Sequence, residues 1–280
     1  MKPRQRRLVN RLMSALSAVA AVATILPLLL IFGFLLYQGA SAVNVEFFTQ
    51  LPKPVGEVGG GMGNAIVGSL ILVGMAAVLG VPLGVLTGVY LAQSRDTRLP
   101  WITRFLADVL NGVPSIVIGL FAYALLVLPM RRFSAVAGAA ALAIIMLPIV
   151  ARTSEEMVRL VPASLHEAAL ALGLPEWKVI LRVVLPTARP GIITGVMVAL
   201  ARVAGETAPL LFTAFGNRFW HHGVDQPIAA LPLQIFAYAI APYDDWHRQA
   251  WAGALVLIIL VFVVSLTARL ATGRRAGAMR

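Results

Sequence analysis

Residues 65–92 read AIVGSLILVGMAAVLGVPLGVLTGVYLA, a continuous stretch without a single charged side chain. A helix that crosses the hydrocarbon core of a bilayer needs about 20 mostly apolar residues, so this stretch is long enough to span a membrane. The rest of the chain is similar, because 59% of its 280 residues are hydrophobic and only 12% are charged. Soluble domains carry roughly a quarter charged residues. The composition therefore excludes an ordinary water-soluble protein.

Six apolar stretches along the chain have the length of membrane spans or approach it. Their apolar runs are continuous and do not alternate with polar residues, which is typical of membrane helices and not of the strands of a membrane barrel. We therefore predict an all-α integral membrane protein with six transmembrane helices, over Leu12–Tyr37, Ala65–Ala92, Val113–Met130, Ser134–Val150, Gly191–Ala214 and Trp251–Leu270.

Small residues in the second span recur every four positions, at Gly80, Gly84 and Gly88. This spacing places them on one face of a helix, where they allow another helix to pack closely. Proline interrupts the second and third spans at Pro82 and Pro114. Backbone groups freed by proline are tolerated in a membrane only where protein or water surrounds them, which points to a pathway through the bundle.

The positive charges lie mostly on one side of the predicted spans. With the N-terminus inside, 17 of the 23 Lys and Arg residues fall in inside segments and five fall in outside segments. This bias follows the positive-inside rule, so we expect residues 1–11 and 271–280 to be cytoplasmic. The formal charge of +11 then reflects membrane topology and contact with lipid, not nucleic-acid binding. The first apolar run is longer than the core of a cleaved signal peptide, about 7–15 residues, so we expect it to remain as a span.

Loops divide the chain into a first helix, an outside loop over 38–64 and a core of five spans over 65–270. The core contains a long inside segment over 151–190 and an outside loop over 215–248. His221, His222 and Asp225 in that outside loop could bind a metal ion, but they lack a fixed ligand spacing. We favour solvated loop residues and predict no metal site.

The sequence contains no recognisable motif for catalysis or for nucleotide binding. It contains no cysteine, which excludes disulfides and thiol nucleophiles. A nucleotide-binding P-loop needs Gly-Lys followed by Ser or Thr, and none of Lys2, Lys53 and Lys178 follows a glycine. We therefore predict no catalytic residue and no cofactor in this chain.

The inside segment over 151–190 has the pattern of two short amphipathic helices. Its apolar residues recur at helical spacing from Leu165 to Leu172 and again from Trp177 to Val184, with a break at Gly173-Leu174-Pro175. Helices this short are not stable alone in water, so each apolar stripe needs a covering surface. That surface is either the membrane face of this chain or another protein.

The same segment resembles the EAA loop of ABC importer permeases, E-A-A-x3-G-x9-I-x-L-P. The matching residues are Glu167, Ala168, Ala169, Gly173, Leu185 and Pro186, with Val183 in place of the isoleucine. In that family the loop forms a coupling helix that docks on a cytoplasmic ATPase subunit. The resemblance implies the bundle of a type I importer permease, with ATP and Mg bound by the partner ATPase and not by this chain.

Three further stretches resemble the A-type permease subunits of phosphate importers. They are Asn111–Phe121, Arg202–Ala214 with its run GETAPLL, and Leu231–Phe236. The resemblance covers essentially the whole chain. It implies that inorganic phosphate is the substrate, and that the partners are a second permease subunit of the C type, a dimer of ATPase subunits and an external phosphate-binding protein.

Two charged residues lie inside the fifth predicted span. Arg202 and Glu206 are four positions apart, hence on one helix face, and an intramembrane charge costs several kcal/mol unless it is paired or wet. They could form a structural ion pair, and Arg202 could also offer its guanidinium group to an anion. We assign Arg202, Glu206, the neighbouring Thr207 and Arg152, at the inner end of the fourth span, to the substrate pathway. For Arg152, a role as a membrane anchor is equally compatible with the sequence.

Two other functions stay open at this stage. The first is a permease of the same family for another oxyanion. The second is a stand-alone secondary carrier that uses Glu206 as a proton relay, although carriers often show inverted repeats and none is visible here.

Overall fold

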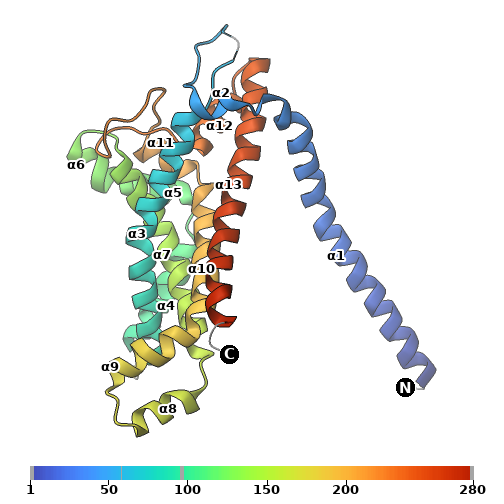
Figure 1. The fold of residues 1–280 in the computed structure, drawn as a ribbon, viewed down its shortest axis with the longest axis vertical. Coiled ribbons are helices and arrows are strands. Elements are labelled where there is room, and N and C mark those ends of the chain that lie inside the picture. Colours follow the sequence, from blue (N-terminus) through green and yellow to red (C-terminus); the bar gives the residue numbers. More distant parts are fainter. Residues whose placement is uncertain (1–2, 58, 95–97, 278–280) are drawn as a thin grey trace.

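The computed structural model describes residues 3–57, 59–94 and 98–277, and these residues are almost entirely helical (Figure 1). The long helices are α1 (Pro3–Gly39), α3 (Gly63–Gln93), α7 (Ala135–Arg159), α10 (Leu185–Ala204) and α13 (Asp244–Gly277). The shorter α-helices are α2 (Val45–Thr49), α4 (Arg98–Gly112), α5 (Ser115–Ala122), α6 (Leu128–Met130), α8 (Ala163–Ala171), α9 (Glu176–Val179), α11 (Ala208–Thr213) and α12 (Leu231–Ala239). A 3₁₀ turn follows α1 (Ala40–Ala42), and π turns join α5 to α6 (Tyr123–Val127) and α9 to α10 (Ile180–Val184).

The prediction of an all-α membrane protein is confirmed, and the six predicted spans compare with five or six candidate spans in the part of the chain that the structure describes. Among the described residues, five helices are long and apolar enough to span a bilayer, and a sixth candidate is a bent pair of helices. The pair joins α4 and α5–α6 across the break at Gly112–Pro114, with an angle of 105° between the two parts. The expected third span, Val113–Met130, is therefore only the second half of this element, and α4 precedes it.

The fifth span also differs from its predicted bounds. The predicted second amphipathic helix is not a separate element, because it runs through π turns into α10 and forms one candidate span over Glu176–Ala204. Pro186 has no N–H to donate to the preceding turn, and the wider π turns lie directly before it. The helix ends at Ala204, so the expected continuation to Ala214 is wrong. The residues from Ala208 form the separate helix α11.

The centre of the bundle is the seam between α3 and α7. A Cβ atom added at Gly84 would lie 2.7 Å from the Cβ atom of Val150, and one added at Gly88 would lie 2.5 Å from the carbonyl oxygen of Ala151. The backbones of the two helices therefore approach as closely as the predicted glycine stripe implies. The largest cluster of buried apolar residues extends from this seam, with Leu72, Met146 and Val150 among its members.

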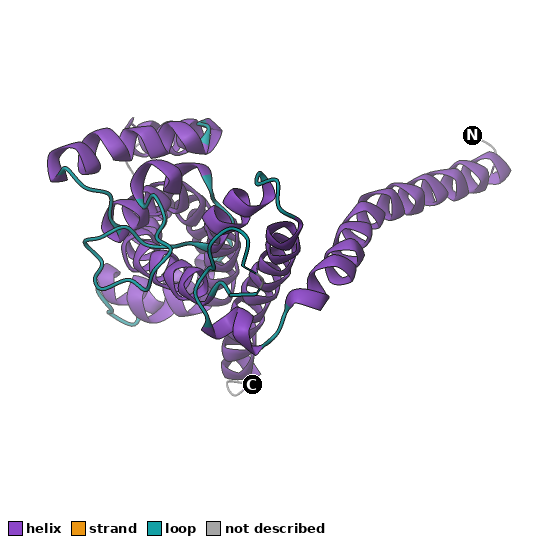
Figure 2. Ribbon diagram, turned by 90° about the horizontal axis from the view of Figure 1, so that it is seen from above, coloured by secondary structure: helices purple, strands orange, loops and turns teal. Residues whose placement is uncertain are grey.

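The first helix projects away from the rest of the molecule (Figure 2). Apolar side chains along its length are exposed, including those of Leu16, Leu28 and Leu30. Near its end it packs on the bundle, where the Phe34 ring lies edge-on against Trp251 of α13, with ring centroids 5.1 Å apart. The helices that surround the α3–α7 seam thus form the body of the molecule without α1.

The two ends of the bundle carry different elements (Figure 1). Helix α8, the beginning of α1 and the end of α13 lie at one end. Helices α2 and α12 lie at the other end, and a second apolar cluster containing Phe47, Met62 and Leu231 packs there. We call these the α8 end and the α12 end. Residues 278–280 and 1–2 of the predicted terminal segments lie outside the described residues.

The close packing of α3 on α7 predicts that substitutions of two glycines in α3 change the stability of the protein differently. A Cβ atom at Gly88 would meet the backbone of α7, whereas one at Gly74 would meet nothing within 4 Å. We expect Gly88→Ala to destabilise the protein by about 1–3 kcal/mol through overpacking. Gly74→Ala should be neutral or slightly stabilising because alanine is the better helix former. Thermal unfolding of the two purified variants in the same detergent measures the difference, and equal midpoints would contradict the seam.

Candidate functional site

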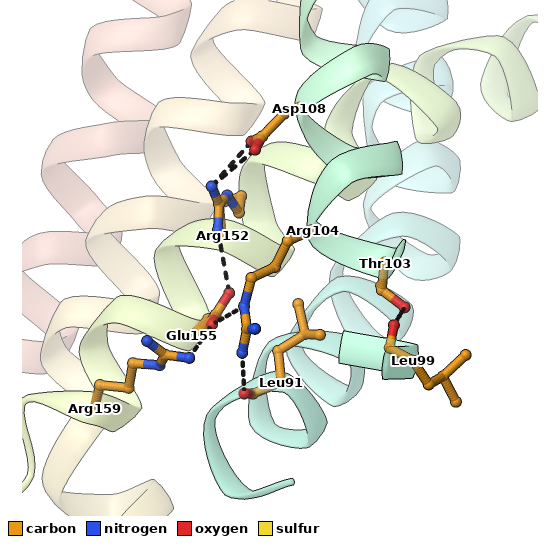
Figure 3. A network of polar contacts seen from close by, with 8 residues as sticks. All are labelled: Leu91, Leu99, Thr103, Arg104, Asp108, Arg152, Glu155 and Arg159. Carbon is orange, nitrogen blue, oxygen red and sulfur yellow. Dashed lines mark hydrogen bonds and ion pairs between the residues drawn. The ribbon is translucent and has the colours of Figure 1, made fainter. Parts of the chain in front are cut away.

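A buried carboxylate lies near the α8 end of the bundle. The side chain of Glu155, on α7, is only 3% exposed, and three arginines converge on it (Figure 3). Arg104 Nε lies 2.7 Å from Glu155 Oε1, Arg159 Nη2 lies 2.8 Å from the same oxygen, and Arg152 Nη1 lies 3.4 Å from Oε2. Each oxygen of this buried carboxylate faces at least one guanidinium group, and these ion pairs offset the cost of removing the side chain from water.

The same arginines connect three helices. Arg104 of α4 donates a hydrogen bond from Nη2 to the carbonyl oxygen of Leu91, 2.7 Å away, in the last turn of α3. Arg152 of α7 forms an ion pair of 3.0 Å with Asp108 of α4. The cluster therefore ties α4 to both α3 and α7 (Figure 3). Its three guanidinium groups face two carboxylates, which leaves one excess positive charge.

Arg202 and Glu206 lie at the point where α10 ends. Arg202 Nε is 3.9 Å from Glu206 Oε1, the upper limit of an ion pair, and the Arg202 side chain is 51% exposed. They do not share the face of one continuous helix as expected, because the backbone leaves the α-helix after Ala204. Hydrogen bonds from the amides of Gly205 and Glu206 to the carbonyl oxygens of Arg202 and Val203 close this turn.

Thr207 begins the next helix. Its carbonyl oxygen accepts hydrogen bonds from the amides of Leu210 and Leu211, which starts α11. Helix α11 packs directly on α5, since a Cβ atom at Gly119 would lie 2.6 Å from the Cα atom of Pro209. The contact places the break in the fifth span beside the second half of the bent third span. Two interrupted helices thus meet close to Arg202 and Glu206.

The structure separates the predicted pathway residues into two groups. Arg202, Glu206 and Thr207 lie together, whereas Arg152 belongs to the cluster around Glu155. Sequence reasoning missed Glu155 and Asp108. The sequence did contain a signal for the ion pairs of Glu155. Glu155 lies three residues after Arg152 and four residues before Arg159, and both spacings are typical of ion pairs on one helix face. No pattern in the sequence indicated that α4 packs beside Glu155.

The predicted coupling segment projects from the α8 end. Glu167 and Ala168 are exposed on α8, and Ala169 is buried. The helix ends at Ala171, and the turn after it uses Gly173, whose φ of +79° lies in the left-handed region that glycine adopts without strain. Leu172 is 83% exposed just before this turn. The coupling segment therefore exposes apolar surface at Leu172, as expected for a segment that another protein covers.

His221, His222 and Asp225, which the sequence predicts to be solvated loop residues and not metal ligands, lie in the loop between α11 and α12. Asp225 forms an ion pair of 3.1 Å with Arg132. Within the described parts of the chain, no group of three or more His, Asp or Glu side chains is arranged to hold a metal ion.

The cluster around Glu155 predicts a strong effect on stability. Glu155→Gln keeps the size of the side chain but removes its charge, and so leaves three arginines without their shared partner. We expect the free energy of unfolding to fall by about 2–4 kcal/mol. Glu156→Gln is the matched control, since Glu156 is the next residue and is exposed. Thermal unfolding in detergent compares them, and a Glu155→Gln variant as stable as the control would refute a stabilising cluster.

The family model described as "Binding-protein-dependent transport system inner membrane component" matches residues 80–275. The chain is 43% identical to the phosphate transport system permease protein PstA of Yersinia pestis, over 94% of this chain and 90% of that protein. It is 46% identical to PstA of Xylella fastidiosa strain 9a5c, over 95% of this chain and 93% of that protein.

Solved structures of ABC importers share the fold. A crystal structure of a bacterial alginate ABC transporter, in complex with an alginate-bound periplasmic protein, contains a chain that matches with a TM-score of 0.64 at 12% identity, covering 100% of this chain and 98% of that one. The MetNI methionine transporter matches with a TM-score of 0.56 at 18% identity, covering 78% of this chain and 97% of that one. Fold and sequence agree: the chain belongs to the inner-membrane permease components of ABC importers, within the PstA family of phosphate transport system permeases.

Proposed function

We propose that this chain is a transmembrane permease subunit of an ATP-driven importer of inorganic phosphate in the bacterial cytoplasmic membrane. The observation that carries the proposal is the identity of 43–46% to phosphate permeases along 94–95% of the chain. The α8 end, which carries the coupling segment, faces the cytoplasm together with both termini. The distribution of Lys and Arg supports this orientation.

Import of phosphate needs an external source of energy. Moving a dianion inward against an inside-negative potential costs about 4.6 kcal/mol per 100 mV. The chain has no nucleotide-binding motif, so the proposal assigns ATP and Mg to a dimer of ATPase subunits. The exposed residues around Glu167 and Leu172 form the docking surface for that dimer. A second permease subunit, of the C type, completes the pathway, and an external phosphate-binding protein delivers the substrate.

Arg202 is the residue we assign to phosphate inside the membrane. Its side chain is half exposed and only loosely paired with Glu206, at 3.9 Å. A guanidinium group presents several N–H donors in a planar fork that matches phosphate oxygens. Glu206 holds this fork in place while phosphate is absent and gives it up when the dianion arrives. Thr207 adds a hydroxyl group beside them.

Arg152 is the second cation on the path, nearer the α8 end. It already shares Glu155 with two other arginines and contacts Asp108. The excess positive charge of this cluster attracts an anion that has passed Arg202. In the transport cycle, closure of the ATPase dimer pulls on α8 and opens the bundle outward, phosphate enters past Arg202, and hydrolysis returns the bundle to its inward-open form.

Loss of the Arg202 charge should abolish transport. We expect Arg202→Gln to reduce ATP-driven uptake of radiolabelled phosphate into vesicles by a factor of about 100 or more, because no other cation lies in an ion pair beside Glu206 among the described residues. Arg189→Gln, exposed on the same helix, is the control and should transport normally. Uptake by the Arg202→Gln variant at the rate of the control would exclude the assigned role.

Changes in the coupling segment should separate ATP hydrolysis from transport. Gly173→Val forces a β-branched residue into the left-handed region at φ +79°, and Glu167→Ala removes the exposed carboxylate of α8. Both variants should insert into the membrane but lose phosphate uptake and retain less ATPase during purification. Glu57→Ala, which changes an exposed carboxylate outside the coupling segment, is the control. Normal uptake by both coupling variants would contradict docking at α8.

A further inference from the structure

A pocket of about 400 Å³ opens between α11 and α12. These two helices lie at the end of the bundle opposite to α8 (Figure 1). Its walls are mainly apolar and aromatic, with Phe215, Tyr238 and Trp246 among them. Polar groups enter from Asn217, Arg218 and Gln234. The pocket therefore combines apolar walls with a single cation.

The Arg218 side chain carries a positive charge that no ion pair of the described residues neutralises. It is exposed, and its guanidinium carbon lies 5.9 Å from the centroid of the Trp246 ring, within the range of a cation–π contact. Two neighbouring arginines of the same end differ, because Arg132 pairs with Asp225 and Arg248 pairs with Asp245. No carboxylate of the described residues forms an ion pair with Arg218.

No other group in the pocket cancels this charge. Burial raises the pKa of Tyr238, so its hydroxyl group is neutral at physiological pH. Asn217 and Gln234 are neutral amides. An anion that enters the pocket therefore meets the full charge of Arg218.

The loop that carries Arg218 is held in place before any partner arrives. The Asn217 side chain accepts a hydrogen bond from the Phe219 amide at 2.9 Å and donates one to the carbonyl oxygen of Pro227 at 3.3 Å. Asn64 of α3, which is buried, donates to the carbonyl oxygen of Asn217 at 2.9 Å. A loop ordered in advance loses little conformational entropy on binding.

The surroundings of the pocket resemble a protein-binding surface. Phe219 is 70% exposed beside it, and Ile240, which contributes to its wall, is 68% exposed. Arg, Trp and Tyr are the residues that most often carry the binding energy of protein interfaces, and exposed apolar neighbours exclude water around them. A free phosphate dianion carries two charges, whereas this pocket offers one cation within mainly apolar walls, so burying the dianion there would leave a charge uncompensated.

We propose that this pocket receives the carboxylate of an Asp or Glu side chain from the phosphate-loaded binding protein, with Arg218 as its counter-ion. The inference rests on the proposed function and adds the contact through which the binding protein docks. The carboxylate pairs with the guanidinium group in a site from which Trp246 and Phe219 exclude water. Apolar residues flanking the carboxylate on the binding protein fill the rest of the pocket.

The test uses the complete importer in lipid nanodiscs and the phosphate-loaded binding protein. We expect Arg218→Glu to weaken binding of that protein by about tenfold or more, because it replaces attraction by repulsion. Arg248→Glu is the matched control and should change binding by about twofold or less, since its charge lies in an exposed ion pair. Arg218→Ala should also reduce the dependence of binding on salt concentration.

Phosphate uptake into proteoliposomes separates the outcomes. Weaker binding with uptake restored at a high concentration of binding protein supports the proposal. Unchanged binding by Arg218→Glu overturns it, and unchanged binding with lost uptake assigns Arg218 to phosphate or lipid instead, which also overturns it. Uptake by the unaltered importer is measured in parallel, because failure of that uptake would refute the proposed function itself. Normal co-purification of the variant with its partners confirms that it folds.

Discussion

The bundle depends on one buried charge, the carboxylate of Glu155. It is 3% exposed, and an unpaired carboxylate in such a place would cost several kcal/mol. Arg104, Arg152 and Arg159 remove that cost and at the same time connect α4 to α3 and α7. This ionic cluster therefore helps to hold the first half of the bent third span against α3 and α7. The cluster also lies near the end that carries α8, the segment proposed to dock on the ATPase subunits.

The interruptions of the helices determine where the proposed pathway residues lie. A continuous apolar helix has every backbone group bonded internally and offers nothing to a polar substrate. The third span breaks at Gly112–Pro114 and the fifth span ends at Ala204, and the contact of Gly119 with Pro209 brings the two interrupted segments together. Arg202 and Glu206 lie at this meeting point. The ion pair between Arg202 and Glu206 is long, so the guanidinium group of Arg202 can still contact another anion. The shorter ion pairs around Glu155 hold helices together.

Much of the fold could be predicted because its signals are local. Apolar length predicted the spans, the glycine stripe predicted that another helix packs closely on α3, and the turn at Gly173 was recognisable from the residues around it. Only the structure identified α7 as that helix. The bounds of the third and fifth spans were wrong because apolar composition does not distinguish one continuous helix from two segments joined at a bend. The role of Glu155 was missed because a charge at the inner end of a span resembles an ordinary interfacial residue until its neighbours are known.

The amino-acid sequence by itself determined that the chain is helical, that it resides in a membrane, where its positive charges accumulate and which segment resembles a coupling loop. These properties follow from residue type and spacing within one helix or loop. The tertiary structure alone decided that Arg104 of α4 reaches Glu155 of α7 and that Arg218 rests on Trp246 beside an open pocket. Such contacts join residues far apart in the chain, and their formation depends on how whole helices pack, which no local pattern encodes.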